Sequence, residues 1–292
     1  AGNGDTIDDG AVLTRLFVYD INTNKEKKIA DSTIKFGEIY EERFNDRWIV
    51  WLDTNQNGTN IIYCMDRNSG KISDIKTCSF NKPQLRLWGD NIVWVEQKSE
   101  KEDRLYLYNI ANGEPPVCLE SFDNPTYGTC PPEIAKDVVL WVCKSPQNPK
   151  CSMIKKLDLG NVSKTSADEL EPEIIDPKGF AIYPATNGQV IAWLDNIDPE
   201  KASLKITKDG TNIKSIANGV GRLFGVGRDF VAYTQNDNIM LYFWDDDSYS
   251  YLAKSDEHGR LSSCSVTDNQ VVWYANDPKD KKDIVKISTV ER

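Results

Sequence analysis

Four glutamates are the residues whose type best suits acid–base chemistry. Glu38, Glu41 and Glu42 come just before one strongly apolar run of the chain, and Glu133 comes just before another. Two carboxyl groups held several ångströms apart, on either side of a glycosidic bond, hydrolyse carbohydrates. These glutamates therefore define one candidate chemistry, that of a carbohydrate-active hydrolase or lyase, provided that the fold brings Glu38, Glu42 and Glu133 together.

The single histidine gives little support to nucleophilic catalysis. His258 lies in the sequence Glu257-His258-Gly259, and the chain has no Gly-x-Ser-x-Gly motif to present a serine nucleophile. A Ser-His-Asp triad would have to use His258 as its base. We interpret His258 as a polar loop residue and assign no catalytic residue.

The stretch from Asp53 to Gly58 opens like a calcium-binding loop. Asp53, Asn55 and Asn57 place oxygen ligands at the first, third and fifth positions, and Gly58 stands at the sixth. This spacing suits a hard cation, which takes oxygen ligands around a sharp turn. The twelfth position is Cys64, however, where a bidentate glutamate is expected. A calcium site and a plain hairpin loop closed by Asn57-Gly58 are the two interpretations, and we expect no other cofactor.

The chain has seven cysteines, none of them in the Cys-x-x-Cys spacing that would favour zinc. Cys143 and Cys151 flank a short loop that contains two prolines. Because they stand at equal distances from the centre of that loop, we predict that they face each other across a hairpin, where a disulfide can form. The cysteine usage fits either an exported protein with one or two bridges or a reducing compartment with none.

A repeated element must position these candidate residues. A run such as Trp48-Ile49-Val50-Trp51, preceded by a tight polar turn, recurs six times, starting at positions 48, 92, 138, 190, 230 and 271. Six of the eight tryptophans lie in these runs. Self-similarity at such a period indicates a repeat architecture, and large apolar side chains allotted to each repeat suit a core shared between stacked units.

Each repeat has the pattern of four short strands. A less polar inner strand precedes the apolar run, as in residues 84 to 88, and a third strand with period-two alternation follows it, as in residues 105 to 109. Turns of the Asn-Gly type, such as Asn112-Gly113, connect the third strand to a fourth. Four antiparallel strands per repeat with no convincing helix predict an all-β fold, a β-propeller of four-stranded antiparallel blades.

We predict six blades in a single domain over residues 13–292, after a flexible polar lead-in at residues 1–12. The C-terminal end supplies three strands of the last repeat, and residues 16 to 30 form a hairpin that matches the third and fourth strands of the other repeats. We expect the ring to close by pairing of these N- and C-terminal strands, since closure removes exposed sheet edges. Seven blades, one of them incomplete, is the alternative.

The repeats resemble a known bacterial family. The line Gly89-Asp90-Asn91-Ile92-Val93-Trp94, followed by Leu105-Tyr106-Leu107-Tyr108-Asn109 and the Asn112-Gly113 turn, is similar to the TolB-like β-propeller repeats. The resemblance covers nearly the whole chain from about residue 16. It implies the architecture, but no particular chemistry, because such propellers serve as protein-binding platforms, enzyme appendages and occasionally enzymes.

The charge of the chain argues against a nucleic-acid partner, and its hydropathy argues against a membrane-spanning segment. The net charge of −10 and the pI near 4.8 argue against nucleic acid, because binding a polyanion needs a basic face. No apolar run approaches the roughly 20 residues that span a bilayer, so we expect no membrane-spanning segment.

The mouth of the propeller channel, near the starts of the inner strands, is the remaining candidate surface. Aromatic and arginine side chains anchor many protein interfaces; at this mouth we predict binding by Tyr40, Arg86, Tyr127, Tyr183, Arg222 and Arg260. The alternative is that these residues only fill the channel. We expect a non-enzymatic module that binds an unidentified protein or cell-envelope ligand outside the cytoplasm. A carbohydrate-active enzyme and a cytoplasmic location are the alternatives.

Overall fold

The structure is a computed structural model that falls into two compact units, Ala1–Phe122 and Asp123–Arg292. Its described part consists of strands and turns with one single-turn helix, α1 (Leu159–Val162). No helix in this part is long and apolar enough to cross a bilayer. The described residues are 5–6, 12–32, 39–54, 59–78, 83–123, 130–148, 150–162, 171–176, 179–198, 200–255, 261–276 and 283–291.

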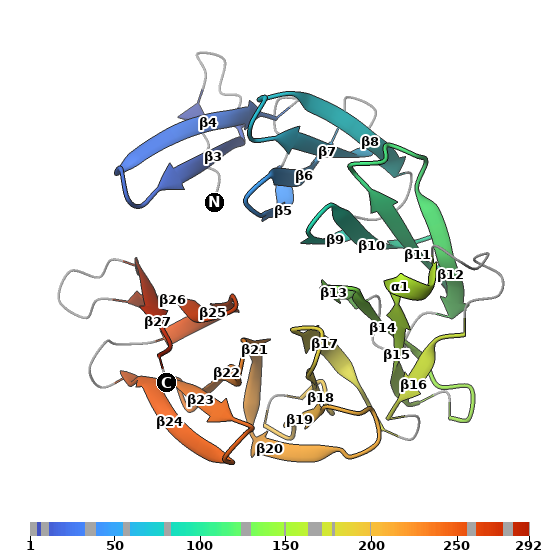
Figure 1. Ribbon diagram of the computed structural model, residues 1–292, viewed down its shortest axis with the longest axis vertical. Helices are drawn as coiled ribbons and strands as arrows, with labels where there is room; N and C mark the ends of the chain where they lie inside the picture. The colour runs from blue at the N-terminus through green and yellow to red at the C-terminus, as the bar shows by residue number, and fades with distance from the viewer. Residues whose placement is uncertain are drawn as a thin grey trace. The chain divides into compact units, whose positions relative to one another are not determined.

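The first unit contains two hairpins and two complete sheets (Figure 1). One hairpin pairs β1 (Asp5–Thr6) with β2 (Val12–Leu13), and the other pairs β3 (Arg15–Asp20) with β4 (Lys25–Asp31). Blade 1 is a four-stranded antiparallel sheet of β5 (Tyr40–Phe44), β6 (Trp48–Thr54), β7 (Asn60–Asp66) and β8 (Ile72–Cys78). Blade 2 repeats this order with β9 (Gln84–Trp88), β10 (Asn91–Gln97), β11 (Glu102–Asn109) and β12 (Val117–Asp123).

The second unit contains four further sheets of the same kind. Blade 3 comprises β13 (Glu133–Ala135), β14 (Val138–Lys144), β15 (Ser152–Asp158) and β16 (Glu173–Ile175). Blade 4 comprises β17 (Ile182–Thr186), β18 (Ile191–Leu194), β19 (Ser203–Thr207) and β20 (Lys214–Asn218). Blade 5 comprises β21 (Val220–Val226), β22 (Phe230–Gln235), β23 (Asn238–Phe243) and β24 (Ser248–Ala253). Blade 6 comprises β25 (Leu261–Val266), β26 (Gln270–Asn276) and β27 (Asp283–Thr289).

The β-propeller fold predicted from the repeats is confirmed. Six inner strands, β5, β9, β13, β17, β21 and β25, each open an antiparallel blade, and the strands of every blade pair in chain order. Five blades have all four strands among the described residues, whereas blade 6 has three there. Pairing of the N- and C-terminal strands, and the division into a lead-in and a single domain, stay predictions.

The second strand of each blade explains the repeated apolar run. All of β6 from Trp48 to Asp53 is buried, as is β10 from Ile92 to Glu96. A strand in the middle of a sheet that is covered on both faces buries its odd and even side chains alike, so its sequence reads as a continuous run rather than as an alternation. The run therefore marks the middle of a blade.

The repeated aromatic residue of a blade packs against the element before it. Trp94 of blade 2 lies in one buried cluster with Leu52 and Ile62 of blade 1. The equivalent residues of four other blades also pack against the preceding element. Trp51 packs against the hairpin of β3 and β4, Trp193 against blade 3, Tyr233 against blade 4 and Trp273 against blade 5. Each tryptophan or tyrosine thus joins two consecutive elements of the chain.

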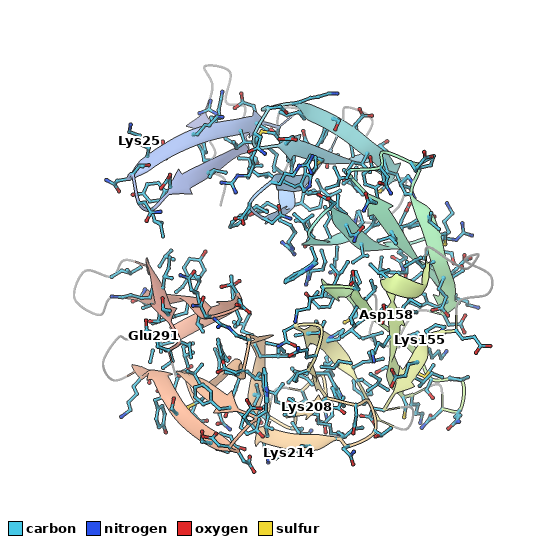
Figure 2. The ribbon with its side chains drawn as sticks, viewed as in Figure 1. Lys25, Lys155, Asp158, Lys208, Lys214 and Glu291 are labelled. Carbon is cyan, nitrogen blue, oxygen red and sulfur yellow. The ribbon has the colours of Figure 1, made fainter. Side chains whose placement is uncertain are left out.

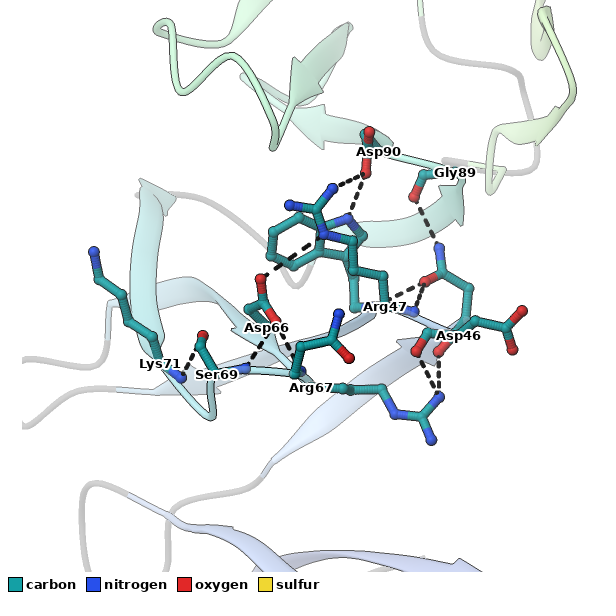
Figure 3. A network of polar contacts seen from close by, with 11 residues as sticks. Asp46, Arg47, Asp66, Arg67, Ser69, Lys71, Gly89 and Asp90 are labelled. Atoms are coloured by element: carbon teal, nitrogen blue, oxygen red, sulfur yellow. Dashed lines mark hydrogen bonds and ion pairs between the residues drawn. The ribbon is translucent and has the colours of Figure 1, made fainter.

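The turn between the first and second strands ties blade 1 to blade 2 (Figure 3). The indole Nε1 of Trp48 donates to Asp90 Oδ1 at 2.6 Å, and Asn45 Nδ2 donates to the carbonyl of Gly89 at 2.8 Å. Arg47 adds an ion pair to the same Asp90 carboxylate at 3.6 Å and covers the Trp48 ring at 4.5 Å. Polar contacts at the turns therefore reinforce the apolar contact between these blades.

In the second unit, an asparagine at the equivalent turn also donates a hydrogen bond to the next blade. Asn187, six residues before Trp193 as Asn45 is six before Trp51, donates from Nδ2 to the carbonyl of Gly227 in blade 5 at 2.7 Å. In both turns the amide Oδ1 accepts the backbone N–H groups two and three residues further on. One side chain therefore closes its own turn and holds the next blade.

Aspartates at or just beyond the ends of three strands, β3, β7 and β19, cap the turn that follows. Asp20, Asp66 and Asp209 each accept two backbone N–H groups through one carboxylate oxygen. These hydrogen bonds favour the ionised carboxylate. They lower the pKa of all three residues; the largest cause is the N–H of Thr23 for Asp20, of Ser69 for Asp66 and of Asn212 for Asp209.

Candidate functional site

The inner strands carry bulges beside the repeated tryptophan. In β5 the pairing with β6 shifts between Tyr40 and Arg43, and in β17 the pairing with β18 shifts between Ile182 and Ala185. β21 and β25 show comparable shifts. A bulge places an extra residue in the strand and redirects its side chains, which is why bulges often lie beside functional sites.

Two of these bulges hold residues other than glycine at a positive φ. Glu41 has φ 54° and Tyr183 has φ 50°, and each lies ten residues before the tryptophan of its blade. This left-handed conformation is uncommon for residues with a bulky side chain and costs on the order of 1 kcal/mol or more. Strain of this kind is found most often at binding and catalytic sites.

Glu41 is held by two arginines from neighbouring inner strands. Its Oε2 lies 2.8 Å from Arg43 Nη2 and 3.9 Å from Arg86 Nη1. All three side chains are about one quarter to one third exposed, so the cluster is open to solvent. Two guanidinium groups, those of Arg43 and Arg86, thus lie against the carboxylate of Glu41.

Arg43 and Arg86 differ in how firmly they are fixed. Arg43 donates from Nε to the carbonyl of Leu85 in blade 2 at 3.0 Å and from Nη1 to the carbonyl of Glu42 at 2.7 Å, so it joins the two inner strands. Arg86 donates from Nη1 to the carbonyl of Leu85 at 2.8 Å. We infer that Arg43 positions Glu41 and that Arg86 is the better placed of the two to contact a ligand.

Tyr40 lies at the start of β5, next to this cluster in the chain. Its hydroxyl donates to Asn60 Oδ1 at 2.5 Å, and Thr54 Oγ1 donates to the same oxygen at 3.1 Å. The ring packs against the core between blades 1 and 2. Tyr40 and Arg86, both predicted to bind, therefore belong to the inner strands of the same unit.

Tyr183, also predicted to bind, is partly buried. Its backbone N–H donates to Cys130 Sγ at 3.3 Å, and its ring packs against two buried clusters, one between blades 3 and 4 and one between blades 4 and 5. Arg222 lies in the bulge of β21, and nothing is described of its side chain. Tyr127 and Arg260 fall outside the described residues.

The calcium hypothesis concerns a stretch that is described only at its start. Asp53 is the last buried residue of β6, at 3% exposure, and Asn55 and Asn57 lie outside the described residues. Where the structure is described, no three acidic, cysteine or histidine side chains come together as metal ligands. Calcium at Asp53, Asn55 and Asn57 stays a prediction.

The hairpin register does not place the two cysteines of the expected bridge opposite each other. Cys143 lies opposite Met153 and Lys144 lies opposite Ser152, and neither Cys143 nor Cys151 is in a disulfide. The two cysteines are therefore out of register, because the loop is not centred midway between them. This corrects the assumption of equal spacing.

The glutamates proposed for acid–base chemistry gain no support. Glu41 is committed to two guanidinium groups, and Glu38 and the single histidine, His258, lie outside the described residues. Glu42 is on β5 of the first unit and Glu133 opens β13 of the second. The described residues therefore give no support to the alternative of a carbohydrate-active enzyme.

Sequence reasoning missed Arg43 and the role of Glu41 as the centre of the cluster. Neither residue differs in type from many exposed surface residues. What distinguishes them is their place in the bulge of β5, beside Trp51 of β6, where the register shifts. The shift is a property of the backbone pairing, so no residue pattern in the sequence reports it.

Comparison with solved structures places the fold among β-propellers. The chain is similar to the β-propeller domain of the Trilobed protease from Pyrococcus furiosus, with a TM-score of 0.70 and 14% identity over 99% of this chain and 93% of that one. It is similar to a prolyl endopeptidase, with a TM-score of 0.61 and 12% identity over 87% of this chain. It is also similar to TolB from Acinetobacter baumannii, with a TM-score of 0.51 and 10% identity over 99% of this chain and 76% of that one.

These likenesses define the class of protein and no more. The chain spans 41% of the prolyl endopeptidase, less than half of that protein. No protein-family model matches the sequence, and no curated protein matches it at the sequence level. At such low identity the shared feature is the β-propeller fold, which hosts many unrelated functions.

Proposed function

We propose that the protein is a non-enzymatic binding module that uses its bulged inner strands to hold a protein or cell-envelope ligand. The observation that carries this proposal is Glu41, a residue at positive φ whose carboxylate is held between Arg43 and Arg86. Strained residues persist where the surrounding structure over-determines them, and such places concentrate at binding sites. The ion pairs supply that support here.

The charge of the cluster suggests the chemistry of the ligand. Arg43 and Arg86 bring two guanidinium groups to Glu41 in a chain whose net charge is −10. Arginine binds carboxylates with its planar fork of donors and is enriched among the anchors of protein interfaces. A ligand that presents an acidic side chain or a chain-terminal carboxylate suits this site best.

The solved structures support a binding role by analogy. TolB and the propeller domain of the Trilobed protease share the fold without sharing much sequence. We propose an extracytoplasmic location, in the periplasm or on the cell surface, and a bacterial-type repeat. The likeness to TolB is the ground for this proposal.

Affinity capture with one substituted arginine tests the function. The immobilised wild type and the Arg86→Ala variant are incubated with a solubilised envelope extract of the cells that make the protein, and retained proteins are measured by mass spectrometry. We expect a specific protein on the wild type that falls about tenfold or more with Arg86→Ala, because loss of an arginine anchor costs about 1.4 kcal/mol or more.

Arg104→Ala is the matched control. Arg104 lies on β11 of the same unit, away from the inner strands, and is ion-paired with Glu102 at 2.8 Å. This variant should retain the protein as the wild type does. Equal retention by Arg86→Ala, or no protein retained by the wild type beyond the bare support, would overturn the proposal.

A further inference from the structure

The outer edge of blade 5 differs from the other outer edges. β24 is the last strand in the order β21-β22-β23-β24, and its sequence is Ser248-Tyr249-Ser250-Tyr251-Leu252-Ala253. Tyr249 is 49% exposed and Tyr251 is 56% exposed. An edge strand presents backbone N–H and C=O groups that are ready to pair with another strand.

Natural sheets protect such edges with charge, and the outer strands of this protein follow the rule except at β24. Among the outer strands that the structure describes, β24 alone has no charged residue. The others carry at least one, as in Lys27 of β4, Asp74 of β8, Glu120 of β12, Glu173 of β16 and Lys214 of β20. Charge on an edge strand discourages pairing between molecules, and its absence at β24 permits it.

We propose that β24 is a dimerisation edge that pairs antiparallel with β24 of a second copy of the chain. With Ser250 on the two-fold axis, Tyr249 lies opposite Tyr251 of the second copy, and the reverse pair forms by symmetry. Cross-strand aromatic pairs stabilise antiparallel sheets, and an interface that uses the same patch on both copies is the usual form of a dimer.

The charges at the two ends of β24 favour the antiparallel orientation. Asp246 lies four residues before Ser250, and Lys254 lies four residues after it. Asp246 lies in the turn before β24 and Lys254 directly follows its last residue, so antiparallel pairing brings the acidic turn of each copy near Lys254 of the other. Parallel pairing would instead place like charges together, which is unfavourable.

Contacts within blades 4 and 5 already hold this edge in place. Tyr249 donates from its hydroxyl to the carbonyl of Ile216 on β20 at 3.1 Å, and the Lys254 ammonium lies 5.1 Å from the centre of the Tyr251 ring. Lys208 and Lys214, labelled on blade 4 in Figure 2, form ion pairs with Asp245 and Asp247 beside the start of β24. An ordered edge loses less conformational entropy when it pairs.

Sedimentation velocity over a range of protein concentrations tests the proposal. We expect the wild type to form a concentration-dependent dimer. Tyr251→Lys places a charge on the edge and removes both tyrosine pairs, so we expect it to weaken dimerisation by about tenfold or more. Ile174→Lys makes the same kind of change at another exposed outer-strand residue, on β16, and should leave the dimer intact.

Charge exchange separates pairing with a second copy from pairing with another peptide. Lys254→Asp brings like charges together at each end of the paired strands and should weaken the dimer, whereas Asp246→Lys combined with Lys254→Asp restores opposite charges there and should recover it. A wild type that stays monomeric, a dimer that survives Tyr251→Lys, or a double variant that fails to recover would overturn the proposal.

Discussion

The indole Nε1 of Trp48 donates a hydrogen bond of 2.6 Å to Oδ1 of Asp90 on the turn of the following blade. The two residues lie 42 positions apart, close to one repeat of the chain. The same pair of turns is joined by Asn45 and Gly89 (Figure 3). Consecutive blades are thus linked by apolar packing in their middle and by polar contacts at this end.

Replacing Trp48 by Phe should show how much the hydrogen bond from Trp48 to Asp90 contributes to the free energy of unfolding. The phenyl ring preserves much of the buried packing but cannot donate to Asp90, so we expect a loss of about 1 kcal/mol in the free energy of unfolding. Urea unfolding followed by tryptophan fluorescence measures it. The double variant with Asp90→Ala should lose less than the sum of the two single variants, because each removes the same bond. Strict additivity would contradict the assignment.

Replacing Trp94 by Ala should be far more damaging than replacing Trp88 by Ala. Trp94 is fully buried between blades 1 and 2 and stacks on Tyr106 with ring centres 5.4 Å apart. Its loss leaves a cavity, so we expect a cost of about 3–5 kcal/mol. Trp88 is 44% exposed, so Trp88→Ala should lower the free energy of unfolding only slightly. Similar midpoints of urea unfolding for the two variants would show that the repeated tryptophan does not join the blades.

The capping aspartates should make the protein sensitive to acid. The pKa of Asp209 is lowered from 3.8, chiefly by the backbone N–H and the side-chain amide of Asn212 and then by the N–H of Thr211. Because this pKa is lower in the folded chain than in the unfolded chain, the ionised carboxylate contributes stability above the unfolded value, and that contribution disappears as the pH falls through the folded value.

Asp209→Asn tests this linkage. Asparagine keeps an oxygen that accepts the same N–H groups but does not titrate. We therefore expect the melting temperature of this variant to fall less than that of the wild type between about pH 7 and about pH 3. Glu200→Gln, which removes an exposed carboxylate from the same unit, should follow the wild type. An identical acid dependence in Asp209→Asn would rule out the cap as a source of acid sensitivity.

The buried cysteines should be inert in the folded protein. Burial raises the pKa of Cys64 and of Cys78 to about 12, and both side chains lie in the core between blades 1 and 2. The thiolate is the reactive form, so alkylation at neutral pH should spare these residues until the chain unfolds. Partly exposed Cys151 should react first. Peptide mapping after iodoacetamide treatment checks the order, and early labelling of Cys64 would contradict the packing.

Calcium should stabilise the protein if the loop after β6 is a metal site. We expect added calcium to raise the melting temperature of the wild type but not of Asp53→Ala, because Asp53 is the first ligand in the spacing. Asp195→Ala changes the equivalent position of blade 4 and should keep the response. No shift in the wild type would end the calcium hypothesis.

The fold was predictable because each blade repeats its signal. The apolar run centred on Trp51 or Trp94 marks a strand buried on both faces, and the turn residues mark where the strands end. Irregularities were not predictable in the same way. The bulge at Glu41 depends on how β5 and β6 pair, and a residue pattern with period two does not report a one-residue insertion.

The candidate site was predictable only in part. Tyr40 and Arg86 were singled out as aromatic and arginine residues on inner strands, and they lie on the inner strands β5 and β9 of the first unit. Tyr183 is an aromatic residue of the same kind, and its partly buried ring packs against two core clusters. Residue type suggests which side chains bind well, but whether a side chain faces solvent is decided by the local backbone.

Hydrogen–deuterium exchange with the captured ligand tests the central claim most directly, namely that the inner strands form the binding surface. We expect binding to slow exchange in β5 and β9, around Glu41 and Arg86, and to leave the outer strands β8 and β12 unchanged. Protection confined to β8 and β12, with β5 and β9 unaffected, would contradict it.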